Sequence, residues 1–585
     1  MATSPATRTL SGRPRALSVS GALAWPAAAA AIAAAVVLRV TGLGRVQPDP
    51  FYDAAVRSMG ESWHAFLFGA LEPGGSVSID KPPLDLWLQV VSTKSLGFST
   101  SALLLPEALG GCAAVALLFV LVRSLWGAAE AVAAAAALAV LPVSVLTSRS
   151  DTMDSLTAAL TLVAAVLVVR SARSGGRWPL AAAGAAVGLA FNAKLFQALI
   201  PVPALAVLYV AASPLALGER LSRLALASGV GLAVGLAWLA VVTSAPSRDQ
   251  PWAFGSTNGS AINATFVYNG IDRLGSQPTS GTAHRATPRL AARRAKTQWR
   301  RLGTPGPLRL VGTGGALRGR LAPELVPALL LGGLALLAAA IAARRRRGAE
   351  LLPRARLARA GAAVLTVWLL TGLVLFSVIT HLQVRYLEGF TPAVAAALGT
   401  GTVAIVRRVR LPGWVAAVAM AALLVAPVKS SLAVVHAGAS DSGHLGTMPA
   451  SETALLSNYL RRHSAHTRYE VASATAIKAA PLIVRDGRPV LMLAAQRGQA
   501  VTSLHRLKVA IRHGRVRYLF TAPCGAASAA RPAGCGRANH WAQVHGRDVS
   551  LRAGLSHRGL LFRLPPYRAH SLRRQHAHHR WPRVR

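Results

Sequence analysis

The chain has 585 residues, of which 53% are hydrophobic, and its mean hydropathy is +0.42. Soluble proteins of ordinary composition are less apolar, so these values indicate a membrane protein. Lys and Arg number 64 against 21 Asp and Glu. These basic residues cluster in short loops between apolar runs, which argues against nucleic-acid binding. Three cysteines exclude a disulfide-dense scaffold and a cysteine-rich zinc module.

Eleven apolar segments are about long enough to cross a bilayer. We expect spans at 22–44, 102–122, 128–147, 155–170, 179–193, 195–212, 224–243, 322–343, 360–380, 389–406 and 412–435. The first is too long for a signal-peptide core, so it is predicted to be a retained span. The fifth and sixth are short, and Asn192 and Lys194 at their junction predict a tight hairpin that turns at one membrane face.

The arginines predict the orientation of the spans. Basic residues precede span 1 and follow spans 2, 4, 6, 8 and 10; they include Arg15, Arg123, Arg170, Arg220, Arg344 and Arg407. By the positive-inside rule this face is cytoplasmic, so residues 1–21 lie inside the cell and the C-terminus lies outside. The basic loop 284–301 is on the outer side, which is tolerated because long loops translocate largely regardless of charge.

The sequence therefore predicts a polytopic α-helical membrane protein with a transmembrane domain at 22–435 and large outer loops at 45–100 and 244–321. Helix-like runs at 452–462 and 503–513 alternate with strand-like runs at 469–472, 489–493 and 516–521. This alternation predicts an extracytoplasmic α/β domain at 436–565. Residues 566–585 read as a basic His/Arg-rich tail. A transporter usually has small loops and charges within its spans, and we expect neither here.

The first outer loop carries Asp49, Tyr52, Asp53 and the run Asp80-Lys81-Pro82-Pro83. A residue before proline is held extended, so the ammonium of Lys81 projects from a stiff stretch near the membrane surface. A compact cation there suits a lipid-linked phosphate. A lysine that snorkels to the membrane interface explains the same pattern equally well.

The third and fourth spans are joined by a polar turn that contains Arg149, Asp151 and Asp154. The two acids would share one face at the positive end of a helix, although helix capping by Asp151 is the simpler explanation. Lys194 is expected level with Lys81 and Arg149 at the outer face. Three cations and several carboxylates at one face predict a site for an anion and for the proton of a nucleophile.

Several motifs, taken in order, resemble the family 39 glycosyltransferases of the GT-C superfamily. The motifs are Phe51–Met59, Asp80–Leu84, Arg149–Asp154, Phe191–Phe196, Trp252–Thr257, Tyr268–Gly270, Pro305–Leu310 and Arg385–Glu388. That family includes protein O-mannosyltransferases and lipid A aminoarabinose transferases. The resemblance is strongest to mannosyltransferase-like proteins of the YkcA/YkcB type from actinobacteria, and it covers most of the chain.

The resemblance implies a polyprenyl-phosphate donor that carries one sugar, such as mannose, and transfer at the outer membrane face. It also implies that an acid of the first outer loop acts on the acceptor. Relatives often have an Asp-Glu pair before the tyrosine, whereas this chain has Pro48-Asp49 and then Asp53, so either acid could serve. Lys81 matches the Lys-Pro motif that the family associates with the donor phosphate.

The mechanism that follows has Asp49 or Asp53 as the general base. Lys81, Lys194, Arg149 and Arg385 would stabilise the leaving phosphate, and Asp80, Asp151, Asp154, Tyr52 and Tyr386 would bind the sugar or the acceptor. A divalent metal is compatible with this many acids, but no ligand spacing demands one. Two other interpretations stay open: a flippase of lipid-linked sugars, and a cell-wall assembly protein with a degenerate site.

Cys524 and Cys535 lie in a Gly/Ala/Pro-rich stretch that is predicted to be outside the cell, where disulfides are permitted. A bond between them would close a ring of about a dozen residues and contribute roughly 3 kcal/mol in the chain-entropy model. Two free thiols are the alternative. Cys112 falls within the second span and has no expected partner.

Overall fold

A computed structural model describes residues 21–272, 305–311, 322–345, 353–379, 382–442, 446, 448–495, 499–521 and 534–565. It has a helix at each of the eleven predicted spans: α1 (Gly21–Val40), α5 (Thr100–Leu125), α6 (Ala128–Val140), α8 (Asp154–Ser174), α9 (Arg177–Lys194), α10 (Val202–Ala212), α11 (Leu217–Ser244), α14 (Ala322–Arg345), α15 (Pro353–Val378), α16 (Thr391–Arg408) and α17 (Gly413–His436). Among the described residues, seven helices are long and apolar enough to cross a membrane, and three others are shorter apolar helices. The predicted multi-pass helical architecture is confirmed.

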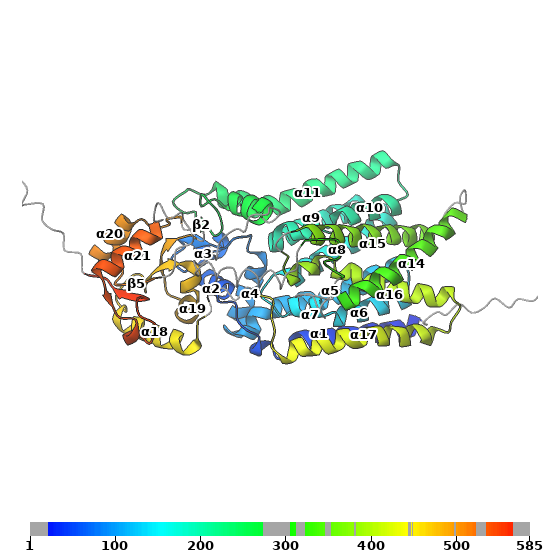
Figure 1. Cartoon of the computed structure of the whole chain (residues 1–585). Helices are drawn as coiled ribbons and strands as arrows, with labels where there is room; N and C mark the ends of the chain where they lie inside the picture. The colour runs from blue at the N-terminus through cyan, green and yellow to red at the C-terminus, as the bar shows by residue number, and fades with distance from the viewer. Residues whose placement is uncertain are drawn as a thin grey trace, which may run out of the picture.

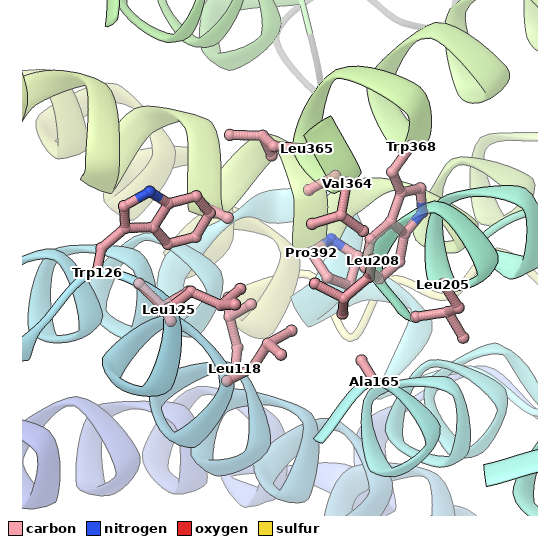
Figure 2. Close-up of a pocket in the computed structure, with 14 residues that line it drawn as sticks. Leu118, Leu125, Trp126, Ala165, Leu205, Leu208, Val364, Leu365, Trp368 and Pro392 are labelled. Carbon is pink, nitrogen blue, oxygen red and sulfur yellow. The ribbon is translucent and has the colours of Figure 1, made fainter. Parts of the chain in front are cut away.

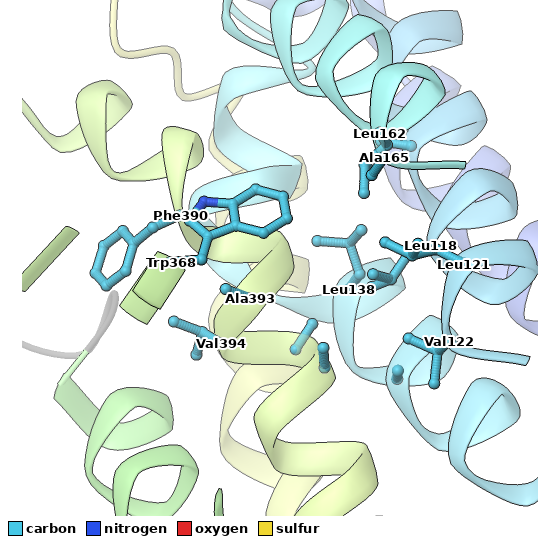
Figure 3. Packing of buried hydrophobic residues seen from close by; sticks show 14 of the residues in the cluster. Leu118, Leu121, Val122, Leu138, Leu162, Ala165, Trp368, Phe390, Ala393 and Val394 are labelled. Atoms are coloured by element: carbon cyan, nitrogen blue, oxygen red, sulfur yellow. The ribbon is translucent and has the colours of Figure 1, made fainter. Parts of the chain in front are cut away.

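These helices lie side by side in one bundle, which occupies the right half of Figure 1. Small residues let some of them touch backbone to backbone: a Cβ added at Gly184 of α9 would lie 2.0 Å from the carbonyl oxygen of Ala227 in α11. Elsewhere larger side chains interlock, and Figure 3 shows Trp368 and Phe390 packed towards Leu138 and Val394. The bundle interior is therefore a close-packed apolar core.

An apolar cavity of about 20 Å³ remains within this core, among α5, α10, α15 and α16. Figure 2 shows Leu118, Trp126, Leu205 and Trp368 around it. Apolar side chains line it and no ionisable residue does, so it supplies no groups for acid–base chemistry.

The break predicted between the fifth and sixth spans is present. Helix α9 ends at Lys194 and is followed by the short helix η2 (Leu195–Leu199), before α10 begins at Val202. Leu195 has φ of 48°, in the left-handed region that non-glycine residues seldom adopt. The chain thus reverses sharply at Lys194, and this reversal holds the lysine at the end of the bundle.

The first outer loop is folded between the bundle and the C-terminal region (Figure 1). It contains α2 (Pro50–Met59), α3 (Trp63–Phe68), β1 (Val77–Ser78) and α4 (Leu84–Leu96). Strand β1 pairs in parallel with β2 (Trp252–Ala253) of the second outer loop, with Val77 opposite Trp252. The two loops therefore form one structure over the end of the bundle.

The C-terminal region contains a five-stranded sheet in the order β4-β3-β5-β7-β6. Its elements are α18 (Ala450–His463), β3 (Ala472–Thr475), α19 (Ala476–Asp486), β4 (Leu491–Ala494), α20 (Leu504–Arg512), β5 (Tyr518–Phe520), α21 (Gly534–His545), β6 (Arg547–Asp548) and β7 (Leu561–Arg563). Strand β3 is parallel to β4 and β5, whereas β7 is antiparallel to β5 and β6. The predicted α/β character is confirmed, although β3 begins three residues later than expected and α19 was not predicted.

One apolar core joins this domain to the first outer loop. Phe51 and Val56 of α2 belong to the same buried cluster as Leu482 and Ile483 of α19. A polar contact adds to it, because the buried carboxylate of Glu72 accepts a hydrogen bond of 3.5 Å from the amide of Val490. Helix α2 is therefore clamped between the bundle and the C-terminal domain.

Parts of three predictions fall outside what the structure describes. Residues 522–533, which include Cys524, the side chain of Cys535 and the tail 566–585 all lie outside the described residues, and so does the basic loop 284–301. The disulfide therefore stays a prediction. Cys112 is a buried free cysteine, as expected.

Candidate active site

The predicted polar residues meet at the end of the bundle that faces the first outer loop. They come from α2, from the stretch before α4, from the turn between α7 (Pro142–Thr147) and α8, from the end of α9 and from the short helix η4 (Val384–Gly389). Segments far apart in sequence thus supply one cluster of charged side chains.

Lys81 sits in a pocket of polar oxygen atoms. Its ammonium donates to the hydroxyl of Tyr52 and lies 3.3 Å from a carboxylate oxygen of Asp80. The amide of Asn269 donates to the backbone carbonyl of Asp80 at 2.6 Å, so the second outer loop holds this stretch in place. The Lys81 side chain is 12% exposed, which leaves the cation accessible yet largely shielded from water.

Lys194 forms the second cationic centre. It forms an ion pair with Asp154 and also donates to the carbonyl oxygen of Thr152. The other oxygen of Asp154 accepts a hydrogen bond of 2.7 Å from Gln197. The ammonium lies 5.9 Å from the ring centroid of Tyr386, close enough for a cation–π contact.

Helix α2 carries the two candidate bases one turn apart. Asp49 is its N-cap and accepts from the amide of Phe51 at 3.3 Å. Asp53 is almost fully buried, and this burial, followed by the charges of Asp151 and Asp49, raises the pKa of Asp53 well above its usual range. A carboxylate with a raised pKa is a stronger base, so Asp53 fits the role of proton acceptor.

Asp151 does not cap α8, contrary to the simpler explanation of its position. The N-cap residue of α8 is Met153, which makes no side-chain capping bond, and Asp151 accepts a hydrogen bond of 2.8 Å from Gln89 instead. Burial, and then the charge of Asp85, raises the pKa of Asp151 well above its usual range. Asp151 is thus a third buried acid, in addition to Asp49 and Asp53 of α2.

Arg149 points away from the other cations. Its guanidinium is buried and donates to the carbonyl oxygens of Leu38, Arg39 and Thr41 at 3.2, 3.1 and 2.7 Å. These oxygens belong to the last turn of α1 and the residue after it, which have no further helical amides to accept. In this structure Arg149 therefore caps α1, and the structure does not bring it to the phosphate-binding position expected from sequence.

Arg385 and Tyr386 approach the site from η4. The backbone amide of Arg385 donates to Asp441 at 2.9 Å, and its guanidinium lies 3.8 Å from the same carboxylate. Asp154 and Tyr52 are near enough to interact electrostatically with Arg385. Asp441 follows α17, so the segment leading to the C-terminal domain helps to position this arginine.

Sequence reasoning missed several functional candidates, and one of its expectations is wrong. The spans do contain buried charges, namely Arg39 in α1, Glu107 in α5 and Glu130 in α6. An ionisable residue within a span is itself a signal of function, so Glu107 could have been found. Asp85 and Gln89, four residues apart on α4, also face the site and could have been found as polar residues at helical spacing.

Within the described part of the chain, no three His, Cys, Asp or Glu residues are arranged to hold a metal ion. The acids of this site instead contact lysines, a tyrosine and amides. The site therefore contains two ammonium groups, a flanking guanidinium group and several buried carboxylates. Such a set can bind a phosphate and accept a proton beside it.

Comparison with known families agrees with this chemistry. Residues 80–243 match the family described as "Dolichyl-phosphate-mannose-protein mannosyltransferase", and residues 456–545 match "Putative mannosyltransferase YkcB-like, C-terminal". Two curated relatives are from Bacillus subtilis (strain 168). "Putative mannosyltransferase YycA" is 34% identical over 231 residues, and "Putative mannosyltransferase YkcB" is 32% identical over 233 residues. Each alignment covers 40% of this chain, but only 34% and 32% of the relatives, about a third of their length.

Solved structures support the fold over a greater length. ArnT from Cupriavidus metallidurans in the apo state has a TM-score of 0.56 at 15% identity, covering 93% of this chain and 98% of its own. The oligosaccharyltransferase of Archaeoglobus fulgidus, tethered with an acceptor peptide, has a TM-score of 0.51 at 13% identity, covering 86% and 69%. The chain is thus a multi-pass helical protein that shares the fold of ArnT, and its residues 80–243 and 456–545 are similar to the two mannosyltransferase families named above.

Proposed function

We propose that this protein is a glycosyltransferase that moves a sugar, a hexose such as mannose, from a polyprenyl-phosphate donor to an acceptor hydroxyl at the outer face of the cell membrane. The observation that carries the proposal is a set of charged groups near enough to interact at one end of a membrane bundle: Lys81 with Lys194 and with Asp151, and Asp151 with the buried carboxyl of Asp53. A related archaeal oligosaccharyltransferase of similar fold, with a TM-score of 0.50, has been solved in complex with a dolichol-phosphate, which supports a lipid phosphate as the donor.

The reaction is a single displacement. Asp53 takes the proton of the acceptor hydroxyl, whose oxygen attacks the anomeric carbon. The bond from that carbon to the phosphate oxygen breaks, and polyprenyl phosphate leaves with inversion at the sugar. A phosphate leaving group needs no proton, so a second acid is unnecessary, and Asp49 is left to cap α2.

The two lysines stabilise the charge that develops on the leaving phosphate. One such well-placed donor is typically worth about 3–4 kcal/mol in the transition state. Each ammonium already has a carboxylate partner, Asp80 for Lys81 and Asp154 for Lys194. Donor phosphate therefore replaces a carboxylate at each lysine, and the displaced acids are then available to hydrogen-bond the sugar hydroxyls. Arg385 adds a flanking positive charge from η4.

The test uses the purified full chain in liposomes with cell-membrane extract as the source of acceptor and radiolabelled polyprenyl-phosphate mannose or, separately, glucose as the donor. We expect consumption of one donor and a labelled acceptor product, which then identifies the sugar. Asp53→Asn should abolish consumption, whereas Lys94→Ala, at an exposed lysine of α4, should leave it intact.

Two other results would refute the proposal. Relocation of the donor across the bilayer without its consumption indicates a flippase of lipid-linked sugars. Binding of the donor with neither relocation nor consumption, with cell-membrane extracts supplied as acceptor, indicates a cell-wall assembly protein that has lost catalysis.

A further inference from the structure

Behind the site, the side chains of Asp85 and Gln89 on α4 meet Asp151 in the turn before α8. The side-chain amide of Gln89 donates to Asp85 and to Asp151, both at 2.8 Å. All three are nearly or completely buried. The side-chain amide of Gln89 thus links the carboxyl group of Asp151, at the candidate site, to that of Asp85, which lies one turn before Gln89 on α4.

Glu107 reaches from the middle of the bundle to the start of α8. Its two oxygens accept hydrogen bonds from the amides of Ser155 and Leu156, at 2.9 and 3.3 Å. Helix α8 has no side-chain cap of its own, so Glu107 satisfies amides that would otherwise be unpaired. The helices touch here, because a Cβ added at Gly110 of α5 would lie 3.0 Å from the Leu156 amide.

The carboxyl groups of Asp85 and Glu107 are close enough to form a side-chain hydrogen bond when one of them carries a proton. Two ionised carboxylates cannot make this bond, since neither carries a donor. Oxygen Oδ1 of Asp85 is buried and has no hydrogen-bond partner in the described structure, so it is available to accept such a proton. Two ionised carboxylates in full burial would also repel each other at close range.

From this geometry we propose that Asp85 and Glu107 share one proton and act as positioning residues, holding Asp151 through Gln89 and Asp154 through the first turn of α8. The proposal rests on the proposed function, because it assigns these residues to the same site. Asp154 is the first residue of α8 and the partner of Lys194, so a shift of this turn moves both groups. Misplacement of reacting groups by about 1 Å can lower turnover ~10²-fold.

The charged groups around the pair decide how it responds to pH. Lys194 of α9 and Asp154 of α8 both act on it, and Asp151 faces it across Gln89. Burial raises the pKa of Asp85, and the hydrogen bonds from Glu107 and Gln89 oppose this shift. Removal of the shared proton at alkaline pH leaves two adjacent negative charges, which repel each other. This repulsion moves Glu107 away from the first turn of α8, so the helix loses its cap and the rate of sugar transfer falls.

Two amide variants replace the shared proton by a permanent N–H while keeping one negative charge. In Glu107→Gln the amide donates to ionised Asp85, and in Asp85→Asn it donates to ionised Glu107. We expect both variants to retain turnover within about 10-fold of wild type at neutral pH. The alkaline limb of their kcat profiles should move to higher pH. Glu107→Leu, which removes both cap and proton, should lose ~10²-fold in kcat.

Glu130→Gln is the matched control, because Glu130 is a buried glutamate of α6 that forms an ion pair with Arg407 away from the site. The alkaline limb of the kcat–pH profile of Glu130→Gln should coincide with that of wild type. An unmoved limb in both amide variants, or wild-type kcat in Glu107→Leu, overturns the proposal.

Infrared spectroscopy separates this inference from the proposed function, since it needs no substrate. The wild-type minus Glu107→Gln difference spectrum at neutral pH should contain the C=O band of a protonated carboxyl group that shifts in D₂O. If the band is present and no sugar is transferred, the proposed function fails while the shared proton stands. If sugar is transferred and the band is missing, the shared proton is wrong.

Discussion

Lys194 and Asp154 form an ion pair although forty residues separate them in the chain. The pair joins the last residue of α9 to the first residue of α8, where one helix ends and the other begins. The contact lies beside Gln197 and the ring of Tyr386, so three separate stretches of sequence meet there. A cation held in this way is largely desolvated before any substrate arrives, which strengthens its attraction for a phosphate.

Asp53→Asn should lower turnover by about 10²–10⁴-fold, because the amide cannot accept the proton of the acceptor. Asp49→Asn should have a much smaller effect, since asparagine caps a helix as well as aspartate does. The raised pKa of Asp53 also predicts that kcat/KM falls on acidification at a higher pH than for an ordinary aspartate, as protonation removes the base. Steady-state kinetics across pH test this. If the Asp53→Asn variant is active and the Asp49→Asn variant is inactive, Asp49 is the general base and Asp53 is not.

Lys81→Ala and Lys194→Ala should each weaken donor use, because each removes a positive charge from the phosphate site. If one lysine supplies about 3 kcal/mol of transition-state stabilisation, kcat/KM for the donor falls by roughly 10²-fold. Lys81→Arg should not restore it, since a planar guanidinium does not fit the position of a compact ammonium. Donor kinetics and the exposed-site control Lys94→Ala provide the comparison. Unchanged kcat/KM in Lys81→Ala would make this residue an interfacial anchor.

Arg149→Gln should act on stability and not on the donor. The substitution removes charged hydrogen bonds to the last turn of α1 and leaves buried carbonyl oxygens without donors. We expect a loss of about 2–3 kcal/mol in the free energy of unfolding, with KM for the donor unchanged in the protein that remains folded. Thermal denaturation in detergent and donor kinetics measure the two effects. If the variant has a raised KM for the donor and an unchanged melting temperature, Arg149 binds the donor phosphate and does not act through stability.

Glu470 of the C-terminal domain should make stability depend on pH. Burial, followed by the nearby Asp486, raises the pKa of Glu470 to about 8. The folded state therefore keeps a proton that the unfolded state releases at about 4.5, so stability declines as pH rises between these values. Glu470→Gln should remove much of this decline and stabilise the protein by ~1–3 kcal/mol at pH 8. Amide hydrogen exchange of β3 and β5 in the intact chain measures this stability as a function of pH. If the stability of the variant and of wild type changes with pH in parallel, the prediction is wrong.

The orientation that the arginines predict implies that reporters fused after Arg347 and after Ala450 report opposite sides of the membrane. The arginines place the first fusion in the cytoplasm and the second outside. Paired alkaline phosphatase and fluorescent-protein fusions measure both positions. A cytoplasmic signal at both positions would contradict the predicted number of spans.

The sequence by itself predicted the multi-pass helical architecture. A helix lies at each of the eleven predicted spans, and seven helices of the described residues are long and apolar enough to cross a bilayer, which demands both length and hydrophobicity from each span. The break after Lys194 and the helices at 450–463 and 504–512 follow from local patterns of the same kind. Lys81 and Lys194 were also recognisable, because an isolated cation beside a proline or at the junction of two spans is a local feature.

Only the tertiary structure decided which polar residues contact one another at the candidate site. Arg149 lies in the same turn as Asp151, yet its guanidinium turns to the end of α1 because carbonyl oxygens there lack donors. Helix capping was the simpler explanation for Asp151, but its carboxylate instead accepts a hydrogen bond from Gln89, while Glu107 caps α8 from another helix. Composition and spacing carry no information about such partners, because a buried polar group is satisfied by whichever donor the packing of distant segments brings within about 3 Å.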